Sequence, residues 1–173
     1  MTCPNCGAPM TLHEGRECMT CDYCRSVSFP EKNADGVRLL GERSELACPV
    51  CAIPLEPALL GPHRVLYCTR CRGSLIPATV FVLAIEELRS QRGEPPAAPY
   101  RPDPAELDRR IQCPECRRPM DTHYYAGPGN IVIDDCARCD LNWLDAGELM
   151  VIVRAPDHPC EAGGASIWEP VGG

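Results

Sequence analysis

Three segments of this chain open in the same way, with a Cys-Pro-x-Cys pair followed three residues later by proline and a large apolar residue. A second Cys-x-x-Cys pair follows each of these openings further along the chain. The three sets of four cysteines are Cys3, Cys6, Cys21 and Cys24; Cys48, Cys51, Cys68 and Cys71; and Cys113, Cys116, Cys136 and Cys139. Two such pairs separated by about 12 to 20 residues are typical of a zinc ribbon, in which two tight turns supply four thiolates to one Zn²⁺ ion. The sequence therefore predicts three zinc sites, one in each repeat.

The size of the repeats makes the metal necessary for folding. A segment of about 35 to 50 residues buries too little apolar surface to fold without a metal or another cross-link. Structural zinc contributes on the order of 10 to 16 kcal/mol in such peptides, so each repeat should be unfolded without it. We therefore expect a small, metal-stabilised, mainly β fold of three tandem zinc ribbons with short accessory α-helices.

Disulfides and iron are the alternatives for so many cysteines. The chain has 14 cysteines in 173 residues, and a disulfide framework would require a secreted protein. The N-terminus reaches Cys3 at once, without the charged and apolar regions of a signal peptide, so we expect a cytoplasmic protein with reduced thiols. A rubredoxin-like iron site is the other alternative.

Two cysteines lie outside the predicted zinc sites. When the repeats are aligned on their last cysteine, Cys18 falls opposite the apolar residues Val65 and Ile133. This position predicts a small buried side chain, and it leaves the later cysteine pair of the first repeat as the ligands. Cys160 lies outside every repeat, and the sequence assigns it no role.

Between its cysteine pairs, each repeat has the pattern of a β-hairpin. In the third repeat, residues 120–125 and 131–134 flank a turn rich in glycine and proline. In the second, residues 55–60 and 64–67 flank a Gly-Pro turn, and the first repeat has shorter strands around Glu14-Gly15. All three are therefore expected to be small antiparallel ribbons.

Two helices are predicted after the ribbons. Residues 79–92 are apolar first and charged later, and their apolar part is too short to cross a bilayer. We expect this helix to pack on the second ribbon, with a membrane surface or a partner protein as the alternative. The second helix should begin at Asp145, where Glu148 completes a capping box, and should end before Pro156.

Composition divides the chain into five parts. They are ribbon 1 (residues 1–47), ribbon 2 with its helix (48–92), a proline-rich linker with a short helix (93–112), ribbon 3 with its helix (113–154) and a loosely ordered tail (155–173). Because the linker separates ribbon 3 from the rest, we expect ribbons 1 and 2 to form one half of the molecule and ribbon 3 the other.

The third repeat resembles a known family. Its two cysteine pairs are followed by the segment Trp143-Leu-Asp-Ala-Gly-Glu-Leu149. This combination is similar to the small bacterial zinc-ribbon family classed as a transcription-factor-IIB-type zinc finger, and the resemblance covers residues 113–149. It implies zinc binding and a link to transcription. The family commonly has glycine directly after its last cysteine, where this chain has Asp140-Leu141. Residues 3–24 and 48–71 resemble generic zinc ribbons.

The distribution of charge bears on nucleic-acid binding. The formal charge is −7, and loading three Zn²⁺ ions onto twelve thiolates makes it about −13, which repels a phosphate backbone overall. Residues 48–76 have a local net charge of +2, whereas residues 113–148 have −4. Ribbon 2 is therefore the candidate nucleic-acid surface, through Arg64, Arg70 and Arg72, with a solvated arginine face as the alternative.

The sequence shows no catalytic pattern. A four-cysteine site leaves no open coordination position for a zinc-bound water, so we expect a protein that is not an enzyme. His13 and His123 share a repeat position that ribbon 2 fills with Ala58, which predicts exposed strand residues. We expect no small-molecule substrate and no membrane partner.

These features favour a protein-docking module. Trp143 and Leu144 are the candidate partner contacts, with a place in the ribbon core as the alternative for the tryptophan. The other functions that the sequence allows are a nucleic-acid-binding regulator and a zinc-linked thiol redox switch.

Overall fold

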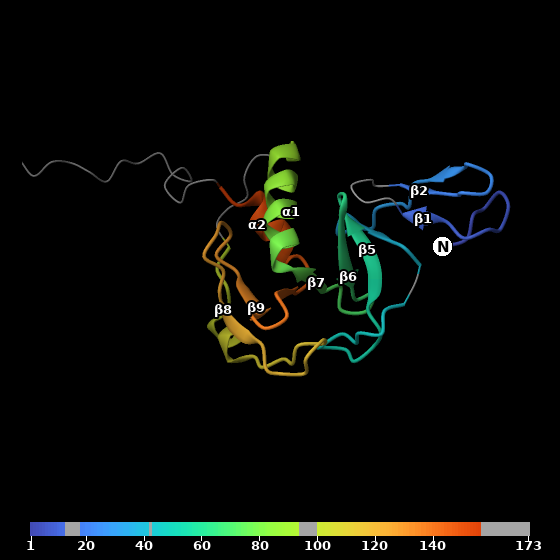
Figure 1. Ribbon diagram of the computed structural model, residues 1–173. Helices are drawn as coiled ribbons and strands as arrows, with labels where there is room; N and C mark the ends of the chain where they lie inside the picture. Colours follow the sequence, from blue (N-terminus) through green and yellow to red (C-terminus); the bar gives the residue numbers. More distant parts are fainter. Residues whose placement is uncertain (13–17, 42, 94–99, 157–173) are drawn as a thin grey trace, which may run out of the picture.

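The computed structural model describes residues 1–12, 18–41, 43–93 and 100–156. In these ranges the chain forms two antiparallel sheets, of three and seven strands, and two α-helices (Figure 1). The small sheet belongs to ribbon 1, and the large sheet unites ribbons 2 and 3. The predicted fold class, a mainly β chain of three ribbons with accessory helices, is confirmed.

Ribbon 1 is a three-stranded sheet. Its strands, in their order in the sheet, are β1 (Thr11–Leu12), β2 (Met19–Thr20) and β3 (Val27–Ser28). Side chains alternate between the two faces of a strand. Met19 therefore points into a buried cluster with Met10, Leu40 and Leu59, while Val27 lies on the opposite, exposed face. Because Leu59 belongs to the large sheet, this cluster anchors ribbon 1 to the rest of the molecule.

The large sheet has the strand order β4-β5-β6-β7-β10-β9-β8. Ribbon 2 supplies β5 (Glu56–Leu60), β6 (His63–Tyr67) and β7 (Ser74–Pro77). Ribbon 3 supplies β8 (Asp121–Tyr124), β9 (Val132–Cys136) and β10 (Leu141–Leu144). The edge strand β4 (Val37–Leu39) lies in the segment predicted as ribbon 1 (residues 1–47), after the small sheet, and pairs with β5. The opposite edge of the sheet is β8.

Ribbons 2 and 3 meet through β7 and β10, their third strands. The two strands are antiparallel, with Trp143 opposite Leu75 and Leu144 opposite Ser74. Counted from the last cysteine of each ribbon, Leu75 and Trp143 are equivalent positions. The pairing therefore follows an approximate twofold axis between these two residues. Ribbons 2 and 3 form one body, and the expectation that ribbons 1 and 2 would form one half of the molecule is wrong.

The two α-helices cover one face of the large sheet. Helix α1 (Ala78–Gln91) follows β7, and α2 (Glu148–Arg154) follows β10, so the two helices have related positions about the twofold axis. Phe81 and Ile85 of α1 and Ile152 of α2 are buried in one core. The sheet residues of this core include Val37, Ala58, Leu60, Val65, Tyr67, Ile76, Ile133 and Leu144. Within the described ranges, neither helix has the length and apolar character needed to span a bilayer.

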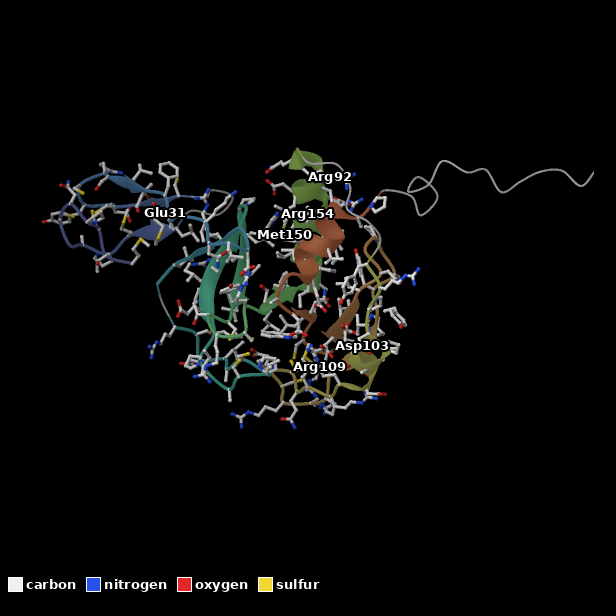
Figure 2. The ribbon with its side chains drawn as sticks, turned by 180° about the vertical axis from the view of Figure 1, so that it is seen from behind. Glu31, Arg92, Asp103, Arg109, Met150 and Arg154 are labelled. Atoms are coloured by element: carbon white, nitrogen blue, oxygen red, sulfur yellow. The ribbon has the colours of Figure 1, made fainter. Side chains whose placement is uncertain are left out.

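Two arginines at the C-terminal end of α1 cap the free main-chain carbonyls at the C-terminal end of α2. Arg92 Nη1 donates to the main-chain carbonyls of Val153 at 3.2 Å and Ala155 at 2.8 Å, and Arg89 donates to the carbonyl of Ile152. The last carbonyls of a helix have no partner within it, and a cation there also offsets the helix dipole. Figure 2 shows Arg92 at this end of the helix pair. Helix α1 therefore packs on α2 as well as on ribbon 2.

The predicted hairpins of ribbons 2 and 3 and the helix at residues 79–92 are confirmed within one or two residues. The short helix before Cys113 is a 3₁₀ turn, η1 (Pro104–Asp108), capped by the Asp103 side chain. The third strand of each ribbon was not predicted. The turn around Glu14-Gly15 and the tail from residue 157 lie outside the described residues.

Candidate metal centres

The structure brings the twelve predicted cysteines together in the same three sets of four. Within each set the Sγ atoms lie within 4.8 Å of one another. The sulfur–sulfur distances include 3.6 Å for Cys3–Cys24, 3.5 Å for Cys6–Cys21, 3.5 Å for Cys48–Cys71 and 3.7 Å for Cys116–Cys136. Each ribbon therefore holds one cage of sulfur atoms between its two cysteine-bearing turns.

These distances fit a tetrahedral zinc ion. With Zn–S bonds of about 2.3 Å, two thiolates at the corners of a tetrahedron lie about 3.8 Å apart. A disulfide would require an S–S distance of about 2.05 Å, and every cysteine in the described residues is free. The three predicted Zn²⁺ sites are confirmed, and each has four protein ligands.

Each cysteine-bearing turn holds one residue in the left-handed conformation. This residue directly follows the second cysteine of the pair, and the set comprises Gly7, Arg25, Ala52, Arg72, Arg117 and Asp140. In the first turn of ribbon 3, the Arg117 N–H donates to the Cys113 carbonyl at 2.8 Å, and the Cys113 N–H donates to the Arg118 carbonyl at 2.8 Å. These bonds curl the backbone tightly around the sulfur pair.

Asp140 stands where the transcription-factor-IIB-type zinc-finger family, which ribbon 3 resembles, commonly has glycine after its last cysteine. Asp140 adopts the required conformation itself, with φ of 55°, because aspartate enters the left-handed region more readily than most side chains. One residue further on, ribbon 2 has Gly73 where ribbon 3 has Leu141. A Cβ on Gly73 would lie 2.2 Å from Trp143 Cζ2. This glycine therefore makes room for the indole ring.

The three zinc sites differ in exposure. In ribbons 2 and 3, two cysteines are buried and two half-buried, whereas Cys6 of ribbon 1 is exposed. Ser26 Oγ lies beside the first site, 2.7 Å from Cys24 Sγ and 3.2 Å from Cys3 Sγ. Its hydrogen bonds lower the pKa of Cys24 to about 5 and also lower the pKa of Cys3. They therefore favour the thiolate, which is the form that binds zinc.

Cys18 is not a ligand. The structure groups Cys21 and Cys24 with the first cysteine pair, and Cys18 lies just before β2 and outside this set. Its side chain is half-buried, so its predicted burial is partial. Cys160 lies outside the described residues.

Trp143 lies at the centre of the core between zinc sites 2 and 3. Its side chain is 0 % exposed, and it shares one apolar cluster with the zinc ligands Cys48, Cys68, Cys113 and Cys136. The two sites therefore share a core on the face of the sheet opposite the helices.

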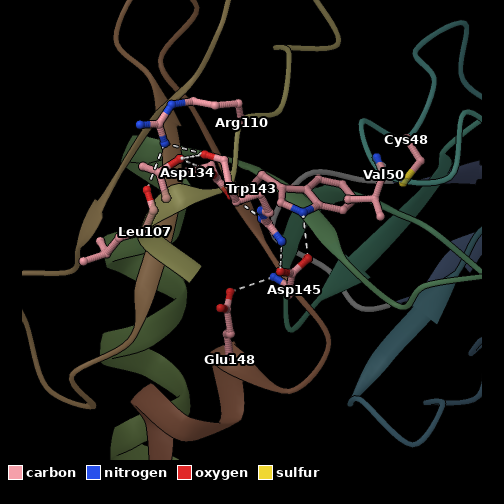
Figure 3. Close-up of polar contacts among 10 residues, drawn as sticks. Cys48, Val50, Leu107, Arg110, Asp134, Trp143, Asp145 and Glu148 are labelled. Atoms are coloured by element: carbon pink, nitrogen blue, oxygen red, sulfur yellow. Dashed lines mark hydrogen bonds and ion pairs between the residues drawn. The ribbon is translucent and has the colours of Figure 1, made fainter. Parts of the chain in front are cut away.

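The residues after Trp143 tie ribbon 3 to its flanking segments (Figure 3). Trp143 Nε1 donates to Asp145 Oδ1 at 3.0 Å, and the Asp145 N–H donates to Glu148 Oε2 at 2.7 Å. Arg109, from the segment before ribbon 3, pairs with both Asp145 and the buried Asp134. Only the glutamate half of the predicted capping box forms, because the Asp145 side chain is engaged by Trp143 and Arg109. Helix α2 accordingly begins at Glu148.

The expected partner contacts at Trp143 and Leu144 are wrong. These side chains are 0 % and 1 % exposed, because β10 lies in the middle of the large sheet with its neighbours on both sides. The alternative given for Trp143, a place in the core, agrees with the structure. No local pattern signalled this burial, which depends on the pairing of ribbons 2 and 3.

The three arginines proposed for nucleic-acid contact fall into two kinds. Asp35 Oδ2 accepts hydrogen bonds from Arg72 Nε at 2.8 Å and from the Tyr67 hydroxyl at 2.5 Å. The hydrogen bond from Arg72 lowers the pKa of Asp35. Arg64, on β6, and Arg70, in the second turn of ribbon 2, are exposed. Arg72 is therefore engaged within the protein, and two of the three arginines face solvent without that engagement.

The fold and the three four-cysteine cages define the chain as a multi-ribbon zinc protein. Matches to two zinc-ribbon family models, one in ribbon 1 and one in ribbon 3, agree with this class. Residues 112–155 match the family model described as "Transcription factor zinc-finger", of the TFIIB type, and residues 3–28 match the model described as "PriA DNA helicase Cys-rich region (CRR) domain". The first match confirms the resemblance of ribbon 3. No curated protein and no solved structure matches the chain.

Proposed function

We propose that this chain is a zinc-dependent docking protein, in which ribbon 1 presents an apolar surface to a partner protein and ribbons 2 and 3 form the base. The observation that carries the proposal is a group of exposed large side chains on ribbon 1. Tyr23, Val27 and Phe29 are 87 %, 51 % and 65 % exposed. We call these three residues the ribbon 1 patch.

The patch lies around the third strand of ribbon 1. Val27 is opposite Thr20 in the sheet and therefore on the face away from the buried Met19. Phe29 is two residues further on, where an extended chain returns to the same face. Tyr23 is in the cysteine-bearing turn that leads into this strand. The zinc site holds this turn in place, so the patch depends on the metal.

The charge around the patch favours a protein partner. Exposed aromatic side chains serve both as anchors in protein interfaces and as stacking surfaces for nucleic-acid bases. Base-stacking sites are combined with a basic groove that follows the phosphates. Residues 1–29 have a net charge of −1, and four thiolates with one Zn²⁺ ion add a further charge of about −2. An anionic ribbon with an apolar patch suits a protein surface better than a phosphate backbone.

The proposed role is not enzymatic, and its proposed setting is the reducing cytoplasm. Closed four-cysteine sites support the first point, since they leave no coordination position for a reacting water. Free thiols arranged in cages support the second, because reducing compartments keep thiols from forming disulfides.

Nucleic-acid binding through ribbon 2 is the second candidate. The exposed Arg64 and Arg70 favour it, as do the matches to a DNA helicase region and a transcription factor zinc-finger. Two exposed arginines predict weak binding that falls steeply with salt. A role in transcription belongs to this candidate and to the docking proposal alike.

The variant Tyr23→Ser/Val27→Ser/Phe29→Ser tests the docking proposal. Immobilised wild-type protein and variant are compared for the proteins that each captures, quantified by mass spectrometry. We expect a partner enriched at least about tenfold on the wild type to be lost on the variant, with three zinc ions per chain in both. The matched control is Val82→Ser/Leu83→Ser, which removes two other exposed apolar side chains, 51 % and 53 % exposed, on α1. Equal loss on the control would contradict the proposal.

Fluorescence anisotropy with single-stranded and duplex oligonucleotides tests the second candidate. Binding that falls steeply with salt and is lost in Arg64→Ala/Arg70→Ala, but kept in the patch variant, would favour nucleic acid. The docking proposal expects no saturable binding at physiological salt.

A further inference from the structure

The twofold relation between ribbons 2 and 3 makes β5 and β8 equivalent strands. Counted from the proline after the first cysteine pair, Ala58 corresponds to His123 and Leu59 to Tyr124. In ribbon 2, β4 pairs with β5, and Leu59 packs against ribbon 1. In ribbon 3, β8 pairs with β9, and no strand of the described residues lies on its other side. One end of the large sheet thus carries an added strand, and the equivalent end carries none. The segment before ribbon 3 contacts β8 in another way, through η1 and through the Thr122 hydroxyl, which donates to the Arg109 carbonyl at 3.1 Å.

Exposure differs accordingly at the two ends. Ala58 and Leu59 are both 0 % exposed, whereas Tyr124 is 45 % exposed and His123 is exposed. Figure 1 shows ribbon 1 beyond β5 at one end of the molecule and β8 at the other. Strand β4 therefore has no counterpart strand on ribbon 3 among the described residues.

The free edge of β8 offers main-chain hydrogen-bonding groups. The Tyr125 N–H donates to the Ile131 carbonyl of the neighbouring strand at 2.9 Å. In an antiparallel pair, alternate residues direct their N–H and C=O groups toward the partner strand. His123 therefore faces β9, and the main-chain groups of Thr122 and Tyr124 face outward.

Ribbon 2 shows how such an edge is filled. The residue equivalent to Thr122 is Pro57, whose carbonyl accepts the Leu40 N–H at 3.0 Å. Strand β4 itself reads Val37-Arg38-Leu39, with Leu39 opposite Ala58 and Val37 opposite Leu60. An apolar, basic, apolar strand therefore fits the edge of a ribbon in this molecule.

Charge specifies the occupant of the β8 edge further. Asp121 and Asp135 lie directly opposite each other on β8 and β9, where like charges repel. The His123 imidazole is 3.2 Å from Asp135, and Asp121 has no ion-pair partner among the described side chains. A second copy of this chain would bring another acidic strand to the same edge. A strand with lysine or arginine near Asp121 would complement it.

We propose that the free edge of β8 binds an extended, basic segment of a partner protein as an added antiparallel strand, in the way that β5 binds β4. Such strand addition gives affinity through main-chain hydrogen bonds and specificity through alternate side chains. In β4, Leu39 lies opposite Ala58, which is equivalent to His123. In an added strand with the same register, the residue two positions after the Leu39 equivalent therefore lies opposite Asp121. The segment is therefore expected to be apolar, basic and apolar, with a further basic residue at that position.

A synthetic peptide based on β4 tests the proposal on the full-length, zinc-loaded protein. The fluorescein-labelled probe is Gly-Val-Arg-Leu-Leu-Lys, the sequence of residues 36–41 with lysine in the place of Gly41. Its partner probe ends in glutamate instead. We expect saturable anisotropy with the lysine probe and at least about fivefold weaker binding of the glutamate probe. In a ¹⁵N-labelled protein, the shifted amides should be those of residues 121–125.

Two variants show whether the edge of β8 is responsible. Asp121→Lys should reverse the preference between the probes, whereas Glu86→Lys makes the same charge change at an exposed site on α1 and should leave the preference unchanged. The probe could also displace the protein's own β4 from β5. The Asp121 variant separates the two cases, because its substitution lies on β8 and should change only binding at that edge. The ribbon 1 patch variant should bind the probes normally, so failure of the docking surface on ribbon 1 is distinguishable from failure here.

Three results would overturn the proposal. They are absence of saturation up to about 1 mM lysine probe, an equal effect of the Asp121 and Glu86 variants, and a concentration-dependent dimer whose shifted amides fall at residues 121–125. The last result would assign the edge to a second copy of the chain.

Discussion

Gly73 and Trp143 depend on each other at the contact between ribbons 2 and 3. Replacing Gly73 with alanine puts a Cβ 2.2 Å from Trp143 Cζ2, and the indole is fully buried and cannot move aside without disturbing the core. We expect the free energy of unfolding to fall by about 3 kcal/mol. Urea unfolding of the zinc-loaded protein measures it. Gly93→Ala is the control, because no atom lies within 4 Å of its added Cβ; an equal loss there would contradict the explanation.

Glu148 should make stability depend on pH. Burial raises the pKa of its carboxyl to about 7 from 4.5, so the folded protein holds a proton that the unfolded chain releases. The free energy of unfolding therefore falls as pH rises from about 4.5 to about 7. Glu148→Gln is neutral throughout and keeps a carbonyl acceptor for the Asp145 N–H. The variant should be more stable by roughly 2 to 3 kcal/mol above pH 7, with a smaller difference at about pH 5.5. A pH-independent difference would count against a raised pKa.

At the scale of residues, cysteine spacing was enough to identify the zinc ligands. The same spacing excluded Cys18 as a ligand, because aligning the repeats places Cys18 opposite apolar strand residues of ribbons 2 and 3. The role of Trp143 was not predictable to the same degree. Its burial and its need for Gly73 both arise from a strand pairing between two ribbons, which no pattern within either ribbon reports.

At the scale of elements, the stability of a cysteine-bearing turn depends on the residue at its left-handed position. Ala52 occupies it in ribbon 2 with φ of 56°, where ribbon 1 has Gly7. A left-handed alanine costs roughly 1 to 2 kcal/mol, and glycine removes this cost while losing more backbone entropy on folding. We expect Ala52→Gly to stabilise the zinc-loaded protein by up to about 1 kcal/mol in urea unfolding. Ala137→Gly, at an exposed turn residue outside the left-handed region, should be neutral or destabilising. Stabilisation by both would disprove the conformational explanation.

Hairpins and helices were predictable because each is specified by neighbouring residues, through Gly/Pro turns and periodic apolar residues. The third strands β3, β7 and β10 are two to four residues long, which is too short for a clear alternation. Their partners are also distant in the chain. Strand β4, of three residues, exists because β5 has an edge to pair with, and its own sequence gives little indication of a strand.

At the scale of the whole molecule, loss of one zinc site should have different consequences in different ribbons. Ribbon 1 touches the large sheet through a small cluster that includes Leu40 and Leu59, so Cys6→Ser should remove one zinc ion and leave the other two sites intact. Cys51→Ser breaks site 2, whose cluster includes ligands of site 3 such as Cys113. We expect this variant to lose zinc from site 3 to a chelator at least about tenfold faster than the Cys6 variant does. Elemental analysis and chelator competition provide the measurement, and equal rates would show that the two sites are independent.

The arrangement of the ribbons was the part least accessible from the sequence. The proline-rich spacer suggested a division before ribbon 3, yet β7 and β10 pair across it. Composition describes how a segment behaves alone, whereas this pairing depends on the fit of two strand edges more than sixty residues apart, from Ser74–Pro77 to Leu141–Leu144.

The contact of Leu75 with Trp143 has a consequence for how such a pair of ribbons can vary. In a dimer of identical chains, a residue on the twofold axis faces its own copy, so every substitution there is made twice at the same point. Two tryptophans would compete for one space, and two leucines would leave part of it unfilled. Covalent linkage removes this restriction. One half of the contact is free to enlarge while the other shrinks to leucine and glycine, and joining the ribbons in a single chain is what makes this unequal, well-filled core attainable.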